Sequence, residues 1–300
     1  MELKELDVDL VERLRKLDII ARKNTLTQTM EGNWTTMYKG RGMEFAGYRQ
    51  YTYGDDASLI DWKASLRAKQ TLIKEYEEEK NLKVFFLVDV SNSMLFTSTA
   101  KLKCEYVIEL VATMTMGILR SGDAVGLGLF TDRLVAKVEP NIGKAMQYRI
   151  VRELMSVKNY GGNFDFKKAI MYLLSFLKSK ALVIIISDFV GLDEHWKKYL
   201  ELAADRWELI GIMVRDPRDR MLPRNTGQFI LEDPYGDSKL QIDVNQYKKK
   251  YEEYVKKEEA KIAAGFSSTR NSLLNLSTTE DFHIPLISFM KRRGNAMIHQ

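Results

Sequence analysis

A carboxylate and two hydroxyls follow one apolar stretch of the sequence at a spacing that suits a metal ion. The apolar run 84–88 ends at Asp89, and Ser91 and Ser93 follow at alternate positions. Such a run is typical of a strand buried on both faces. Ligands of open α/β sheets bind at the carboxyl ends of the strands. Three hard oxygen ligands on one short loop favour Mg²⁺, and the same ligands also accept Mn²⁺ or Ca²⁺.

Two further segments complete the predicted site. A second all-apolar run, 181–186, is followed by Ser187 and Asp188, and a glycine turn at 161–162 precedes Asn163. If the two strands are neighbours, these loops converge on one rim of the sheet. One coordination position would stay open for a carboxylate of a partner, which describes recognition rather than catalysis. The predicted ligands of the divalent cation are Asp89, Ser91, Ser93, Asn163 and Asp188.

The same residues also have a purely structural interpretation. Aspartates cap the helices that follow them, and closely spaced serines form turns. On this alternative, Asp89 and Asp188 stabilise their loops and bind nothing. The apolar strands before both aspartates, and the glycine turn between them, favour the metal site.

The elements around these residues predict an α/β fold. From residue 82 onward, apolar strands alternate with amphipathic helices, which indicates parallel pairing and right-handed crossovers. We expect a doubly wound, mostly parallel sheet of Rossmann type with one antiparallel edge strand. The expected strands are 82–88, 124–130, 134–138, 181–187, 208–214 and 272–276, and the expected helices are 98–120, 144–157, 166–179, 193–206 and 279–293.

The chain is expected to divide into two parts. Residues 1–80 are too short and too polar to build a good core, so we predict an extension that packs on the main domain, 81–300. Within the main domain, a hairpin and a charged helix form an insertion at about 216–264.

The extension holds an expected amphipathic helix at 8–23 and a second informative segment, 48–67. A short helix is expected at 60–67, with Asp61 near its start. In that segment Trp62 is expected to be buried, and charged residues are expected to tie the extension to the main domain. These charged residues are Arg49, Asp55, Asp56, Asp61 and Arg67.

These motifs resemble a broad type of domain and, within it, a narrower family. The array at Asp89–Ser93, 161–163 and 187–188 resembles the metal site of von Willebrand A domains. Nearly the whole chain resembles the family called domain of unknown function 58. The hallmark of that family is a Gly-Asp-Asp-x-Arg-x-Ile-Asp-Trp-like segment, which here is present in part as Gly54-Asp55-Asp56 and Ile60-Asp61-Trp62. The similarity extends to Arg215-Asp216-Pro217-Arg218, Leu222-Pro223 and 289–293.

The resemblance implies a partner. Members of this family are typically linked to MoxR-type AAA+ ATPases, so the chain is expected to be an adaptor or co-chaperone for such an ATPase, acting on an unknown protein client. Two departures from the family pattern stand out. Asn163 occupies a position that usually holds threonine, and the membrane-spanning helices with which many relatives begin are not found here.

Catalytic interpretations find less support. Asp89 resembles the nucleophile of haloacid dehalogenase-like phosphatases, but Ser91 stands where those enzymes carry a second acid. Neither a Gly-x-Ser-x-Gly motif nor a phosphate-binding Gly-x-x-x-x-Gly-Lys loop is present. We therefore expect no enzyme. The remaining alternative is a structural scaffold with a degenerate metal site that docks through its N-terminal segment.

The amino-acid composition limits the expected partners and the expected cellular location. Basic and acidic residues number 46 and 41 and mostly alternate, as on solvated helix faces, so no nucleic-acid partner is expected. The single cysteine, Cys104, fits a reducing compartment. No apolar run approaches the roughly 18–20 residues of a membrane span, and the start lacks a signal-peptide pattern. These features predict a cytoplasmic protein.

Overall fold

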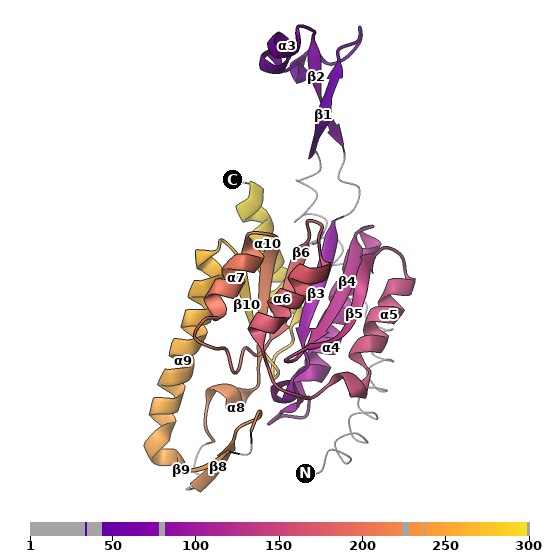
Figure 1. Cartoon of the computed structure of the whole chain (residues 1–300). Coiled ribbons are helices and arrows are strands. Elements are labelled where there is room, and N and C mark those ends of the chain that lie inside the picture. The colour runs from indigo at the N-terminus through magenta and orange to yellow at the C-terminus, as the bar shows by residue number, and fades with distance from the viewer. Residues whose placement is uncertain (1–33, 35–43, 78–81, 224–227, 237, 299–300) are drawn as a thin grey trace.

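A six-stranded sheet forms the body of the protein in the computed structural model, which describes residues 34, 44–77, 82–223, 228–236 and 238–298 (Figure 1). Every neighbouring pair of strands is parallel except β4 and β5, which are antiparallel at one edge. The strand order is β10-β7-β6-β3-β4-β5. The strands are β3 (Lys83–Asp89), β4 (Ala124–Phe130), β5 (Leu134–Asn141), β6 (Leu182–Ser187), β7 (Glu208–Arg215) and β10 (Ser272–Ser277). The predicted fold class is confirmed.

Helices cover both faces of this sheet, because successive side chains of a strand point to opposite faces. Val84, Phe86 and Val88 of β3 belong to one apolar cluster, and Phe85 and Leu87 belong to the other. The first cluster includes residues of α4 (Lys103–Arg120), α5 (Ala145–Leu154) and α10 (His283–Ile298). The second includes residues of α6 (Phe166–Phe176), α7 (Trp196–Ala204) and α9 (Val244–Ser268). Burial on both faces explains why residues 84–88 of β3 and 182–186 of β6 are all apolar.

The element boundaries differ most from the expected ones at α10, which spans His283–Ile298 rather than 279–293, and at the start of α4. Helix α4 begins at Lys103 rather than at residue 98, because the backbone before it makes hydrogen bonds outside the helix. The amide of Ser98 donates to Asp216 over 2.8 Å. The amide of Leu102 donates to Glu105 over 2.7 Å, which caps the first turn of the helix.

Beyond β7 the chain forms a short helix. This helix, α8 (Pro217–Arg220), has Asp216 as its N-cap and proline at its first position. It is followed by the hairpin of β8 (Gln228–Glu232) and β9 (Lys239–Asp243), and then by α9. The expected hairpin and charged helix are therefore present.

A small unit stands apart from the sheet at the N-terminal side (Figure 1). It consists of β1 (Glu44–Gln50), the short 3-10 turn η2 (Ala57–Leu59), α3 (Trp62–Ala68) and β2 (Leu72–Glu77), with β1 and β2 antiparallel. Asp61 caps α3 by accepting from the amides of Lys63 and Ala64, as its position in the sequence predicted. The expected helix at 8–23 lies outside the described residues.

Two expectations for this unit are corrected. Trp62 is 67% exposed rather than buried, because the inward face of α3 is formed by Ser65, which bonds the backbone of Leu72. The ion pairs found for Asp55 and Asp61 in the described residues join them to Arg49 and Lys74, all within the unit itself. These pairs therefore stabilise the small unit locally and do not tie it to the sheet.

The central position of β3 leads to a first prediction. Replacing Leu87, which is fully buried, by alanine removes apolar contacts and leaves a cavity, so Leu87→Ala is expected to lower the free energy of unfolding by about 2–5 kcal/mol. Urea denaturation followed by circular dichroism measures this loss. Met171→Ala is the matched control, since Met171 is 50% exposed on α6 and its replacement should cost little. Equal losses in the two variants would contradict the assigned core.

Candidate functional site

The loops after β3 and β6 meet at one rim of the sheet, because the two strands pair directly and in parallel. The Ser187 hydroxyl donates to one oxygen of Asp89 over 2.6 Å, and the amide of Ser91 donates to the other over 2.9 Å. The hydroxyl oxygens of Ser91 and Ser93 lie 3.4 Å apart. All of these side chains are buried. The Asp89–Ser93 loop and the end of β6 are thus brought together as the sequence indicated.

Asn92, between the two serines, joins the glycine turn to this loop. The backbone amide of Asn92 donates to the carbonyl of Gly162 over 3.0 Å. The side-chain oxygen of Asn92 accepts from the backbone amide of Gly162 over 2.9 Å. Gly161 and Gly162 have φ values of +103° and +97°, which residues other than glycine rarely adopt. The turn therefore reaches the rim, but Asn163 is exposed, whereas Asp89, Ser91 and Ser93 are buried. Sequence reasoning overlooked Asn92.

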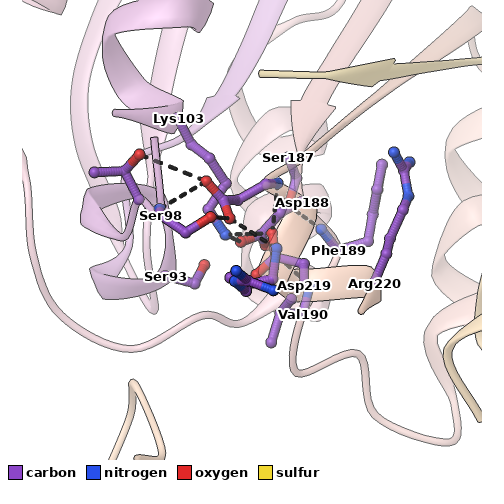
Figure 2. A network of polar contacts seen from close by, with 12 residues as sticks. Ser93, Ser98, Lys103, Ser187, Asp188, Phe189, Val190, Asp219 and Arg220 are labelled. Carbon is purple, nitrogen blue, oxygen red and sulfur yellow. Dashed lines mark hydrogen bonds and ion pairs between the residues drawn. The ribbon is translucent and has the colours of Figure 1, made fainter. Parts of the chain in front are cut away.

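A buried lysine dominates the interior of the site. The ammonium group of Lys103 lies 2.6 Å from Asp188 and 2.9 Å from Asp219, and the lysine side chain is 1% exposed (Figure 2). Lysine is rarely buried unless it is paired, and a positive charge in the first turn of a helix opposes the helix dipole. Burial alone would lower the pKa of Lys103, but the two carboxylates hold that pKa above its ordinary value. Lys103 is therefore an ammonium ion at the start of α4.

The two rim aspartates differ in their electrostatics. Burial, together with the neighbouring charge of Asp188, raises the pKa of Asp89 to about 7. Burial opposes ionisation of Asp188 as well, but Lys103 and Arg215 lower the pKa of that carboxyl below its usual value. The negative charge of the rim is thus concentrated on Asp188, where the lysine balances it.

The segment Arg215-Asp216-Pro217-Arg218, noted above only for its family resemblance, has a physical role here. Asp216 caps α8 by accepting from the amide of Arg218, and the amide of Asp216 donates to Asp219 over 2.8 Å. This reciprocal cap holds the Asp219 carboxylate in the position where it bonds Lys103. Asp216 also accepts from Ser98, so the segment fixes the loop that leads into α4.

Tyr235, at the tip of the β8–β9 hairpin, closes the rim from outside. Its hydroxyl lies 2.9 Å from the hydroxyl of Ser93 and 3.2 Å from that of Ser91. It also lies 3.2 Å from the carbonyl of Val190, in the loop after β6. No pattern in the sequence singled out this tyrosine, because it is 142 residues away from Ser93 in the chain.

These contacts test whether the predicted donors fit a divalent cation. Asp188 is engaged by the ammonium of Lys103, which already supplies positive charge, and the Tyr235 hydroxyl stands beside both serine hydroxyls. The donors as arranged do not fit the cation, so the site of Asp89, Ser91, Ser93, Asn163 and Asp188 stays a prediction.

The sheet order and the loops at its rim define a doubly wound α/β domain with a mostly parallel sheet. The chain belongs to a family of proteins of unknown function, DUF58, whose family model matches residues 47–261. An uncharacterized protein of Mycobacterium tuberculosis is 25% identical over 299 residues, which cover 98% of this chain and 93% of the relative.

Two solved structures match this chain at low sequence identity and low structural similarity. An aerotolerance-related membrane protein from Bacteroides fragilis is 14% identical, with a TM-score of 0.43, and the match covers 72% of this chain and all of that one. A von Willebrand factor type A protein from Catenulispora acidiphila is 9% identical, with a TM-score of 0.29, over 47% of this chain and 34% of that one.

The comparisons correct the predicted location. The chain was expected to be cytoplasmic, but a solved structure among the matches is described as a membrane protein. In the part of the chain that the structure describes, no helix is long and apolar enough to cross a bilayer. That finding does not assign a compartment, so the cytoplasmic prediction is withdrawn.

The buried lysine leads to a second prediction. Lys103→Met leaves Asp188 and Asp219 without their counter-charge, so we expect the variant to lose about 3–5 kcal/mol of unfolding free energy. Mg²⁺ at millimolar concentration should restore part of this loss, because a cation can then approach the two carboxylates. Urea denaturation with and without Mg²⁺ measures both effects.

Lys101→Met is the matched control, since Lys101 pairs with Glu109 at a partly exposed position and its loss should cost under about 1 kcal/mol. Stabilisation of the unaltered protein by Mg²⁺ would contradict this account, because it would show that a cation binds with Lys103 in place.

Proposed function

We propose that this chain is a non-catalytic protein-interaction module that binds its partner at the rim of the sheet. The observation that carries the proposal is the meeting of the Asp89–Ser93 loop, the glycine turn and the loop after β6 at the carboxyl ends of β3 and β6. This is the edge at which open α/β sheets bind ligands. The proposed contact surface consists of Ser91, Asn92, Ser93, Gly162 and Val190. Ser91 and Ser93 are buried beneath Tyr235 in this structure, so a partner reaches them only after Tyr235 is displaced.

The chemistry of the rim supports recognition rather than catalysis. A serine nucleophile needs a base within hydrogen-bonding distance. His195 pairs with Glu194 and is largely exposed, and His283 bonds Asp281, so neither described histidine stands beside Ser91 or Ser93. The lysine that reaches the site is held by Asp188 and Asp219. A phosphatase reaction at Asp89 is disfavoured as well, because this carboxylate is buried and Ser91 stands where such an enzyme carries its second acid.

The identity of the partner rests on the family resemblance. We propose a MoxR-type AAA+ ATPase, for which this chain serves as an adaptor or co-chaperone toward a protein client. Because the donors at the rim do not fit a divalent cation as arranged, we propose that recognition uses direct hydrogen bonds to the rim and needs no bridging metal.

A second candidate function is a scaffold that docks through the small N-terminal unit. Trp62 and Leu66, four residues apart on α3, are 67% and 81% exposed and lie on one side of that helix. Exposed apolar surface of this kind marks interaction sites in many proteins. On this alternative, the same ATPase contacts α3, and the rim only stabilises the fold.

A third prediction separates the two surfaces. The double variant Ser91→Ala with Ser93→Ala removes the rim hydroxyls and should weaken capture by a purified MoxR-type ATPase by about tenfold, as expected for two lost hydrogen bonds. The double variant Trp62→Ala with Leu66→Ala should bind like the unaltered chain. Binding is measured by biolayer interferometry without nucleotide, in Mg²⁺ and again in EDTA.

Ser267→Ala is the matched control, because Ser267 is an exposed serine on α9, away from the rim. Loss of binding only in the α3 variant would support the scaffold instead. Loss in EDTA, with the rim variant also inactive, would restore the metal-bridged mechanism. Circular dichroism confirms that each variant is folded.

A further inference from the structure

The tip of the β8–β9 hairpin is seated on the rim through both its side chain and its backbone. The Tyr235 hydroxyl lies 2.9 Å from Ser93, 3.2 Å from Ser91 and 3.2 Å from the carbonyl of Val190. The side chain of Asn92 donates to the carbonyl of Pro234 over 3.0 Å. Four groups of the rim thus contact two consecutive residues of the hairpin, as a binding site contacts a short peptide.

The rim also has a place for the aromatic ring. Gly191, in the loop after β6, has a φ of +89°, and a Cβ atom at this position would lie 3.0 Å from Cε2 of Tyr235. A larger residue would therefore push the ring away from the serines. The glycine, the two hydroxyls and Asn92 together suit a tyrosine that follows a residue with a free carbonyl.

The hairpin is anchored at its base and weakly supported toward its tip. Ile242 and Val244 are buried with Leu222 in a small apolar cluster at the base. Further along the strands, Ile230 and Leu240 are exposed. Two-stranded hairpins are marginally stable by themselves. The tip can therefore leave the rim without unfolding the sheet, since the main apolar clusters do not include it.

We propose that Tyr235 is an intramolecular ligand of the rim, and that a partner protein binds by placing a tyrosine of its own in the same position after the hairpin tip has left. This inference rests on the proposed function and defines the chemistry of the partner residue. The hydroxyl of the incoming tyrosine replaces that of Tyr235 beside Ser91 and Ser93, and the preceding carbonyl accepts from Asn92.

The charges behind the rim restrict which tyrosines fit. The position of the Tyr235 hydroxyl is close to the buried carboxylates of Asp89 and Asp188. The same carboxylates would repel the phosphate of a phosphotyrosine. An unmodified tyrosine is therefore the expected ligand, and its phosphorylation would block binding.

A synthetic peptide tests this inference without the ATPase. The probe is a fluorescent peptide with the sequence of residues 231–236, Leu-Glu-Asp-Pro-Tyr-Gly, and its binding to the full chain is followed by anisotropy. The variant Tyr235→Ala opens the rim and should bind the probe at least tenfold more tightly than the unaltered chain, in which Tyr235 competes. Adding Ser93→Ala to this variant should remove most of the gain.

Three altered conditions make the test specific. A peptide carrying Tyr235→Phe should bind the opened rim at least about fivefold more weakly, because it lacks the hydroxyl that contacts Ser91, Ser93 and the carbonyl of Val190. A phosphotyrosine peptide should not bind. The milder protein variant Tyr235→Phe keeps the ring and should show intermediate binding of the probe, which provides a second measurement if Tyr235→Ala proves poorly folded by circular dichroism.

Equal binding of the probe to the unaltered chain and to Tyr235→Ala would overturn the inference, as would equal binding of the tyrosine and phenylalanine peptides. These results are independent of the ATPase measurement. If ATPase binding needs Ser91 and Ser93 but the Tyr235→Ala variant does not bind the peptide, the inference of a tyrosine ligand is wrong and the proposed function stands. If the Tyr235→Ala variant binds the peptide but ATPase binding is unchanged when both serines are replaced, the proposed function is wrong.

Discussion

The pairing of Lys103 with Asp188 and Asp219 is the interaction on which the architecture of the rim depends. It joins the start of α4, the end of β6 and the helix α8, which are separated by 85 and 116 residues in the chain. A buried charge that loses its partner is strongly destabilising, whereas the complete group is balanced. The three elements are therefore held in one arrangement, and the loops they carry reach the rim in a fixed geometry.

This charge balance determines what kind of recognition the rim supports. The ammonium neutralises Asp188 from inside, and Ser187 and the amide of Ser91 satisfy Asp89. The groups that remain at the outer edge are neutral hydroxyls, a carboxamide and a backbone carbonyl. Such groups discriminate by hydrogen-bond geometry, so the rim is suited to a neutral polar side chain of a partner.

The predictable parts of the fold were those with a local signal. Apolar runs predicted β3 and β6, and Asp61 predicted the start of α3. The residues that were overlooked act across long sequence separations, as Tyr235 does on Ser93. Lys103 resembled an ordinary solvated charge, since only its pairing reveals its burial. Trp62 misled for the opposite reason, because large aromatic residues are usually buried and this one lies on an exposed helix face.

The sheet topology explains why the insertion after β7 reaches the rim at all. Because β7 runs parallel to β6, its carboxyl end lies at the same edge of the sheet as Asp188. The chain leaves that edge through α8 and the hairpin before it returns as β10, so Asp219 and Tyr235 both come from a segment that begins beside the rim. One connection thus supplies the counter-charge partner inside and the tyrosine outside. An Asp-x-Ser-x-Ser loop therefore does not by itself define a metal site, since what the neighbouring connection places around it decides which ligand can approach.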